Sequence, residues 1–269
     1  MPELPEVETI ARGLARALAD KTIANVDVRL PKVAIGNGVP FSRAVAGERI
    51  SGVGRRGKFV VIELASGRSL VVHLRMTGRL IVRPRDAAPY PYTNVTFEFT
   101  DGTGLCFADV RQFGRVRIVE AGERWDAGVG IEPLSEAFTP EHLAALFARR
   151  TTRVKVLLLD QRRIAGIGNI YACEALWEAG IRPSLRAGKV TRAARSRLHA
   201  ALRSVLTRAI EMRGSSVDDY VDADGLRGGY QNVLSVYGRA GEPCPRCGQP
   251  IVRTVIAQRG TWWCRACQK

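Results

Sequence analysis

Hydrophobic residues near the start of the chain recur at steps of three and four positions. Leu4, Val7 and Leu14 follow this spacing, which places them on one face of a helix of about four turns. Pro5 is compatible with the first helical turn, where its missing amide N–H would have no partner. The pattern therefore predicts an amphipathic helix over residues 4–18.

Short apolar runs replace the helical period between residues 22 and 120. Two pairs of runs flank the turn sequences Ser66-Gly67 and Asp101-Gly102, which is typical of β-hairpins. Short strands separated by turns, with one long helix, favour a β-sandwich or barrel-like layer over βαβ units. The predicted strands are 22–30, 58–64, 69–74, 93–99, 104–107 and 115–119.

After a boundary near residues 128–133 the pattern becomes helical, so the fold class is α+β. Thr139-Pro140 opens one predicted helix as N-cap and first helical residue, and a Gly-rich turn at 166–169 precedes another. The polar loop 214–232 is unusually long, which is typical of functional or mobile segments. The predicted helices are 139–149, 152–163, 169–177 and 192–212, and the β-like stretches near the end are 234–238, 251–256 and 261–263.

The net charge of +15 indicates a polyanionic partner, most simply nucleic acid. The charge is uneven, because residues 1–132 carry a net +4 and the remainder carries +11. An Arg-rich proteome is the alternative explanation for part of this excess. No apolar run reaches the length of a membrane span, and the amino terminus lacks the layout of a signal peptide. We therefore expect a cytoplasmic protein without a membrane partner.

Four of the six cysteines form the pattern C-x2-C-x16-C-x2-C near the end of the chain. This spacing is typical of a four-thiolate zinc site, and two disulfides are disfavoured in a reducing cytosol. We expect one structural Zn²⁺, which would supply the folding energy of a segment too small for its own core. The predicted ligands are Cys244, Cys247, Cys264 and Cys267.

The first residues combine a nucleophile with two carboxylates. Removal of Met1 would leave Pro2 as a terminal secondary amine. A terminal amine has a pKa of about 8, against about 10.4 for lysine, so more of it is neutral near pH 7. Such an amine can attack a carbonyl-type carbon, with Glu3 and Glu6 beside it. The alternative is an ordinary helix start with acidic residues favoured by the helix dipole.

Three motifs together identify the chain as resembling the bacterial formamidopyrimidine-DNA glycosylases. They are PELPEVE at the start, GIGNIYA in the middle and QRGTWWC with paired CxxC at the end. The resemblance covers essentially the whole chain. It implies three domains: an N-terminal β-sandwich over residues 1–132, a helical domain over residues 133–238 and a zinc β-hairpin over residues 239–269. The helical domain would contain a helix–two-turns–helix motif and a lesion-capping loop at 214–232. It also implies double-stranded DNA containing oxidised purines as partner and substrate.

The resemblance assigns the chemistry to the amino terminus. Pro2 would attack the sugar of a flipped-out nucleotide, forming a Schiff base and expelling 8-oxoguanine or a formamidopyrimidine. Glu3 would assist at the sugar ring oxygen, and β- and δ-elimination would then cleave the strand. Glu6 and Lys58 complete the expected catalytic set, Lys58 as a phosphate contact beside the lesion.

The resemblance also implies a set of DNA contacts. Some would hold phosphates, others would fill the gap left by the flipped base, and an arginine would pair with the orphaned partner base. The implied contacts are His73, Met76, Arg111, Phe113, Lys155, Asn169 and Arg259. Glu174 is implied, more weakly, in base recognition. The residue pattern alone, without the family resemblance, favours Met76 and Phe113 as core residues and His73 as a structural histidine.

This chain departs from the usual family pattern at several positions. Arg75 stands where many members have glycine, Gln112 replaces a cation, Cys173 replaces a common serine, and Trp262-Trp263 replace smaller aromatics. These differences bear on partner-base preference and affinity, not on the reaction class. Two other functions remain open: a related glycosylase that prefers oxidised pyrimidines, and a basic zinc protein that only binds DNA. A monomer is expected in each case.

Overall fold

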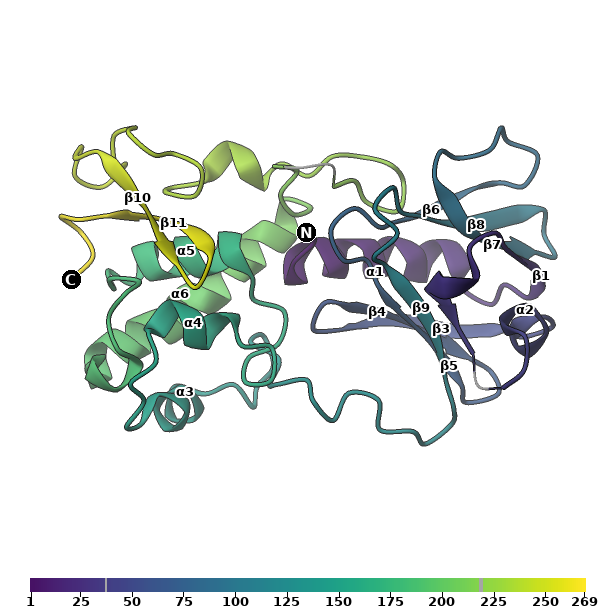
Figure 1. The fold of residues 1–269 in the computed structure, drawn as a ribbon, viewed down its shortest axis with the longest axis horizontal. Coiled ribbons are helices and arrows are strands. Elements are labelled where there is room, and N and C mark those ends of the chain that lie inside the picture. Colours follow the sequence, from purple (N-terminus) through teal and green to yellow (C-terminus); the bar gives the residue numbers. More distant parts are fainter. Residues whose placement is uncertain (37, 218–219) are drawn as a thin grey trace. The chain divides into compact units, whose positions relative to one another are not determined.

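The computed structural model describes residues 1–36, 38–217 and 220–269, and these form two compact units (Figure 1). The first unit contains residues 1–127 and 212–229, and the second contains residues 128–211 and 230–269. Residues 212–229 therefore pack with the N-terminal unit, although they follow the last long helix of the second unit in sequence. Positions 218 and 219 of the predicted 214–232 loop lie outside the described residues.

The first unit is a two-sheet structure with one long helix. Its elements are α1 (Leu4–Leu18), β1 (Ile23–Val28), a 3₁₀ turn (Pro31–Val33), β2 (Ala34–Ile35), α2 (Phe41–Val45), β3 (Ile50–Arg56), β4 (Phe59–Leu64), β5 (Ser69–His73), β6 (Arg79–Pro84), β7 (Thr93–Phe99), β8 (Thr103–Ala108) and β9 (Arg115–Val119). The four-stranded sheet has the order β1-β7-β8-β6, and the five-stranded sheet has the order β2-β9-β5-β4-β3.

One hydrophobic core joins the two sheets and the buried face of α1. Val7, Ile10 and Leu14 of α1 pack in the same cluster as Val60 of β4 and Phe97 of β7, and all five are nearly inaccessible to solvent. Burial of this apolar stripe, more than helix propensity, holds α1 in place. The amino-terminal turn of α1 is thus fixed on a rigid support.

The second unit is helical and carries a small β-hairpin (Figure 1). Its elements are α3 (Pro140–Phe147), α4 (Val154–Leu159), α5 (Asn169–Glu178), a 3₁₀ turn (Ala187–Lys189), α6 (Arg192–Glu211), a 3₁₀ turn (Tyr230–Val233), β10 (Ile251–Ile256) and β11 (Arg259–Cys264). Leu198, Leu202 and Val205 form the buried face of α6. The α+β class expected from the sequence is confirmed.

Three details differ from the sequence prediction. Strands β3 and β6 were not predicted, because ISGVGRR and RLIVRP show no clean alternation. Helix α4 spans only Val154–Leu159, since Asp160 bonds to the chain that follows it and ends the helix. The stretch 234–238 is a turn and not a strand. Three of its N–H groups donate to a buried carboxylate, so they cannot join a β-ladder.

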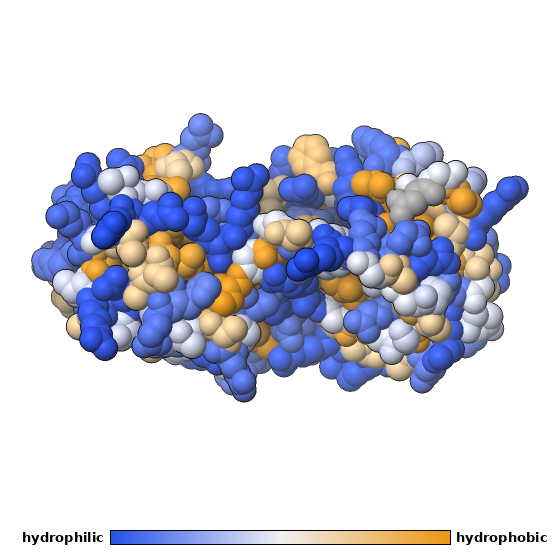
Figure 2. Space-filling view, turned by 90° about the horizontal axis from the view of Figure 1, so that it is seen from below, coloured by the Kyte–Doolittle hydropathy of each residue, from blue (hydrophilic) through white to orange (hydrophobic). Residues whose placement is uncertain are grey.

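The surface in Figure 2 is dominated by hydrophilic residues, with smaller hydrophobic patches between them. Among the described helices, none combines the length and apolar character that crossing a bilayer requires.

Candidate active site

The amino-terminal residues are held at the start of α1 by a hydrogen bond within the turn. The Glu3 backbone N–H donates to Oε2 of Glu6 at 2.8 Å, the arrangement of a helix capping box. Pro2, Glu3 and Glu6 are all buried, with Glu3 4% and Glu6 2% exposed. The candidate nucleophile is therefore anchored next to two carboxylates that the protein has withdrawn from bulk solvent.

Glu6 also binds residues of the polar loop 214–232. Its Oε1 accepts the N–H of Ser215 at 2.7 Å, and the Tyr220 hydroxyl donates to the Glu6 carbonyl at 3.4 Å. Gly214 lies so close that an added Cβ would stand 2.8 Å from Oε1 of Glu6, and its φ is +78°. Only glycine fits here without strain. One carboxylate thus connects the first turn of α1 to the start of the loop.

Lys58 and His73 lie near one another on the five-stranded sheet. Lys58 occupies the turn between β3 and β4 and is 6% exposed. His73 ends β5, where its ring packs edge-on against Phe59 with 4.7 Å between centroids. Its Nδ1 accepts the N–H of Arg75 at 3.0 Å. This bond places the proton of the neutral ring on Nε2, which becomes a hydrogen-bond donor.

The protonation state of His73 follows from its surroundings. Burial, together with the positive charges of Arg75 and Lys58, lowers the pKa of His73 from 6.5 to about 4. The imidazole is therefore neutral at pH 7. A neutral Nε2–H is suited to donating a hydrogen bond to a phosphate oxygen without adding another charge to the site.

Met76, Arg111 and Phe113 project from two loops of the first unit. Met76 and Phe113 are 41% and 50% exposed, so neither side chain belongs to the core. The Arg111 guanidinium lies over the Phe113 ring, 5.0 Å from its centroid. The structure therefore presents these side chains to solvent, and the alternative that Met76 and Phe113 are core residues is wrong.

Asp109 fixes both loops, although the sequence did not identify it as a functional residue. Its Oδ1 accepts the Thr77 hydroxyl and the Arg111 N–H, and its Oδ2 accepts the Gly114 N–H at 2.7 Å. The carboxylate is 1% exposed. The hint in the sequence is its place at the start of D-V-R-Q-F-G, where an aspartate can cap the N–H groups that follow it. Asp109 therefore locks the positions of Met76 and Phe113.

Asn169 bonds to the β10–β11 hairpin at the residue that follows Arg259. The Asn169 amide donates to the Gly260 carbonyl at 3.0 Å, next to Arg259 at the exposed start of β11. Oδ1 of Asn169 is buried and has no hydrogen-bond partner among the described residues. The first turn of α5 and the tip of the β10–β11 hairpin are thus held together.

Lys155 lies buried at the same junction. Its side chain is fully buried, and Nζ donates to the Gly260 carbonyl at 3.0 Å and to the Thr261 hydroxyl at 2.7 Å. Two of the three hydrogens of the ammonium group are thus used by the hairpin, and a DNA contact by Lys155 stays a prediction. Lys155 positions the hairpin strand that begins with Arg259.

Glu174 is buried and bonded to the backbone of the turn before the hairpin. It is 2% exposed and accepts the N–H groups of Ser235, Val236 and Tyr237 at 2.8–3.0 Å. Burial raises the pKa of Glu174, and these three N–H donors oppose that effect. Both carboxylate oxygens accept backbone N–H groups, so Glu174 shapes the turn before the hairpin, and its role in base recognition stays a prediction.

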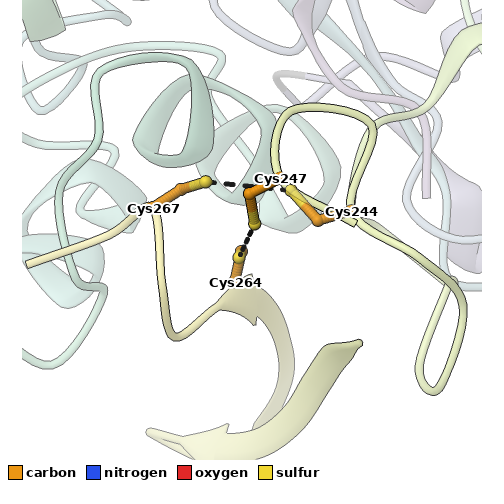
Figure 3. Close-up of side chains that lie close together, drawn as sticks. All are labelled: Cys244, Cys247, Cys264 and Cys267. Atoms are coloured by element: carbon orange, nitrogen blue, oxygen red, sulfur yellow. Dashed lines mark hydrogen bonds between the residues drawn. The ribbon is translucent and has the colours of Figure 1, made fainter. Parts of the chain in front are cut away.

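The four predicted zinc ligands converge in the second unit (Figure 3). All four sulfur atoms lie within 4.8 Å of one another, with Cys247 and Cys264 3.4 Å apart and Cys244 and Cys267 3.9 Å apart. Tetrahedral zinc with Zn–S bonds of about 2.3 Å separates its sulfurs by roughly 3.8 Å. The thiols are free, not disulfide-bonded, so the cluster fits one structural Zn²⁺.

The hairpin and its cluster pack onto α5. Cys244, Cys264 and Ile251 form a small core with Cys173 of α5, and Trp177 packs against it. Trp177 also donates its indole N–H to the Cys244 sulfur at 3.4 Å. Because the hairpin contributes few apolar residues, the metal and this contact together fix its orientation.

Comparison with known proteins agrees with this architecture. Residues 1–116 match the family model of the formamidopyrimidine-DNA glycosylase N-terminal domain, residues 129–221 match that of its H2TH domain, and residues 241–269 match the zinc finger found in FPG and IleRS. Formamidopyrimidine-DNA glycosylases from Pelotomaculum thermopropionicum and Chloroflexus aggregans are 45% and 46% identical. The matches cover 100% of this chain and 99% and 98% of those proteins.

Solved structures show the same fold. The MutM (FPG) protein of Thermus thermophilus superposes with a TM-score of 0.89 at 41% identity, over 99% of this chain and 98% of that one. A Lactococcus lactis FPG mutant in complex with a Fapy-dG-containing DNA superposes with a TM-score of 0.93 at 33% identity, over 100% of both chains. The fold, the four-thiolate zinc cluster and these matches define a zinc-containing DNA glycosylase of the base-excision repair class. The chain belongs to the formamidopyrimidine-DNA glycosylase family.

Proposed function

We propose that this protein flips oxidised purines out of double-stranded DNA, removes them through the amine of Pro2, and cleaves the resulting abasic strand. The observation that carries the proposal is the anchoring of Pro2 and Glu3 at the first turn of α1, where the Glu3 N–H bonds to Glu6. The proposal requires the loss of Met1, so that the secondary amine of Pro2 is free.

The proposed reaction starts with attack of the Pro2 nitrogen on C1′ of the damaged nucleotide. The new C–N bond forms as the bond to the base breaks. Glu3 donates a proton to the sugar ring oxygen. The ring C–O bond then breaks, and the nitrogen lone pair, freed by loss of the Pro2 N–H proton, forms the C1′–N double bond of an iminium that carries no N–H. The iminium acidifies C2′, so loss of a proton there expels the 3′ phosphate, and a second elimination expels the 5′ phosphate.

Glu6 takes a positioning role in this scheme. Both of its carboxylate oxygens accept backbone N–H groups, from Glu3 and from Ser215. It therefore holds the first turn of α1 and the start of the 214–232 segment at fixed positions.

The remaining residues supply DNA contacts. Lys58 and the neutral Nε2–H of His73 would hold phosphates near the lesion. Met76 and Phe113 would replace the stacking lost with the flipped base, and Arg111 would donate to the orphaned partner base.

In the second unit, Arg259 and the amide of Asn169 would bind the sugar–phosphate backbone. The Lactococcus lactis relatives support DNA as the partner, since their structures contain Fapy-dG and abasic-site DNA.

The domain boundaries at 132 and 238, a monomeric state and a cytoplasmic location belong to the same proposal. A monomer suits an enzyme that reads one lesion at a time.

Oxidised pyrimidines are a second candidate substrate class. Lactococcus lactis Fpg is also known in complex with an oxidised-pyrimidine-containing DNA. Relative excision rates on 8-oxoguanine and oxidised-pyrimidine duplexes rank the two classes, and we expect the purine to be faster.

Borohydride trapping tests the mechanism. Protein whose amino terminus is shown by mass spectrometry to be Pro2 should form a covalent adduct with an 8-oxoguanine duplex, and peptide mapping should place it on Pro2. Glu3→Gln should slow trapping strongly, whereas Glu8→Gln, on the same helix and bonded to Arg55 and Arg12, should not. Absence of any adduct with correctly processed protein would leave only a DNA-binding role.

A further inference from the structure

A pocket in the second unit lies between α4 and the turn that joins β10 to β11 (Figure 1). Its volume is about 370 Å³, which is enough for a group the size of a nucleotide. Val156, Leu157 and Leu159 of α4 form an apolar part of its lining, and Leu157 is buried. Arg259, the residue proposed above to bind the sugar–phosphate backbone, also lines the pocket.

Two further arginines line the same pocket. Arg150 follows α3 and Arg163 follows α4, so the fold brings them to Arg259 from another part of the sequence. The Arg150 carbonyl accepts the N–H of Gly188 at 2.9 Å, and the Arg163 carbonyl accepts the N–H of Ile131 at 3.1 Å. Backbone hydrogen bonds therefore hold both arginines at fixed positions, before any ligand binds.

The positive charge of this pocket is not neutralised by the protein. Three arginines and one aspartate among the lining residues leave a net charge of +2. Arg163 donates to Asp160 through Nε at 3.1 Å. Among the described residues, no carboxylate pairs with Arg150 or Arg259. Like charges gathered in one pocket repel one another, and a bound anion would remove that repulsion.

The turn that carries Arg259 is held in an unfavourable conformation. Ala257 and Gln258 have φ values of +49° and +59°, and they form the two-residue turn between the paired residues Ile256 and Arg259. Such turns need positive φ at both positions and are usually built from Asn-Gly. Non-glycine residues keep this geometry only where the surrounding structure requires it. The hairpin thus fixes Arg259 and Ala257 at one wall of the pocket.

The lining matches the chemistry of a phosphate joined to a sugar. Guanidinium groups present paired N–H donors that fit two phosphate oxygens. The Thr152 hydroxyl, which is exposed at the same pocket, can donate another hydrogen bond. The apolar side chains of α4 would contact the carbon atoms of a deoxyribose, which a free inorganic anion lacks.

We propose that this pocket receives one phosphate and sugar of the DNA backbone beside the phosphate that Arg259 contacts, with Arg150 and Arg163 as its phosphate-binding residues. The proposal rests on the proposed function, because it takes Arg259 as a backbone contact. A free sugar phosphate shares this ligand chemistry, and the experiment distinguishes the two sources.

The test measures binding of the full, zinc-containing chain to an abasic-analogue duplex over a series of salt concentrations. Arg150→Gln and Arg163→Gln should each reduce the slope of log K against log salt by about 0.9, and the double variant by about 1.8, because each removes one phosphate contact. Arg192→Gln, an exposed arginine outside the pocket, should leave the slope unchanged. Thermal unfolding and zinc content verify that each variant is folded.

A methylphosphonate scan of both strands locates the phosphate. Replacing one phosphate with this uncharged group, next to the phosphate whose effect depends on Arg259, should weaken wild-type binding roughly tenfold, as for loss of one charge-assisted hydrogen bond. The same replacement should have little effect on Arg163→Gln, because the contact is already lost.

Two outcomes would overturn the proposal. One is a double variant whose salt slope equals that of the wild type, whatever its affinity. The other is binding of free deoxyribose 5-phosphate that requires Arg163 while the slope for the duplex does not, which would assign the pocket to a small molecule. Wild-type protein that binds the duplex but gives no borohydride adduct would count against the proposed chemistry alone, since the slopes are measured without any reaction.

Discussion

Oε1 of Glu6 accepts the backbone N–H of Ser215 at 2.7 Å and so joins two positions that are 209 residues apart. Oε2 of the same carboxylate accepts the N–H of Glu3 at 2.8 Å. Because both residues belong to the same compact unit, the link couples the position of Pro2 to the start of the 214–232 loop. A substitution at the start of the loop should therefore shift the position of Pro2, and a substitution at Glu6 should shift the start of the loop.

Gly214→Ala tests this coupling. The new Cβ would lie 2.8 Å from Oε1 of Glu6 at a φ of +78°, so we expect steric conflict and backbone strain together to cost about 2–4 kcal/mol. Gly225→Ala is the matched control, because its φ is +80° but nothing lies within 4 Å of the added Cβ; it should cost about 1 kcal/mol. Urea unfolding measures both, and equal losses would contradict the coupling. Gly214→Ala should also slow borohydride trapping of the Pro2 adduct, because Glu6 holds the turn that carries Pro2.

His73 should make the stability of the protein depend on pH. Its pKa of about 4 lies below the ordinary 6.5, so between these values the unfolded chain binds more protons than the folded one. The free energy of unfolding should therefore fall as the pH drops from about 6.5 to 4. The contribution of His73 to stability should be fully present above pH 6.5. Urea unfolding of wild type and His73→Gln at pH 7 and pH 5 checks this. The variant should lose less stability between the two pH values, and parallel losses would refute the assignment.

Asp109→Asn should loosen the two loops that carry Met76 and Phe113. An amide cannot accept all three donors that now reach the carboxylate, and an unpaired buried group costs about 1–3 kcal/mol. We expect weaker binding to an abasic-analogue duplex and little change on undamaged DNA. Asp86→Asn, at an exposed position of the same unit, is the control. Equal loss on both duplexes would indicate general unfolding.

Lys155→Met should separate positioning of the hairpin from contact with phosphate. We expect lower DNA affinity with an unchanged salt dependence, because the buried ammonium bonds to Gly260 and Thr261. Arg259→Gln should instead reduce the slope of log K against log salt by about 0.9, the value for one phosphate contact. Lys189→Met, at an exposed position, serves as the control. A reduced slope in Lys155→Met would restore it as a direct contact.

Zinc removal should disable DNA binding through the hairpin. Elemental analysis should find one Zn²⁺ per chain in wild type and in Cys106→Ala, whose thiol lies outside the cluster, but none in Cys264→Ala. A two-stranded hairpin has little stability alone, so the metal-free protein should lose the contribution of Arg259 to affinity. Chelator-treated protein with full affinity would contradict this.

Local sequence patterns determined much of this protein. The three- and four-residue spacing predicted α1 over the same residues, 4–18, that the structure assigns, because one stripe of that helix must be buried. The cysteine spacing predicted the metal cluster, since two pairs of cysteines, each pair separated by two residues, can supply the four thiolates of tetrahedral zinc. The hairpins around Gly67 and Gly102 followed from turn chemistry that acts over a few residues.

Only the tertiary structure decided which polar residues are exposed and which are enclosed. The resemblance assigned Lys155 to a DNA contact and Glu174 to base recognition. In the structure, their hydrogen-bond partners are backbone and hydroxyl groups about 60 to 106 positions away in the sequence. Asp109 gains its role because the fold brings Thr77 and Gly114 to one carboxylate. Hydrogen bonds between distant segments leave no periodic trace in the sequence, and for that reason the supporting residues of the site became visible only in three dimensions.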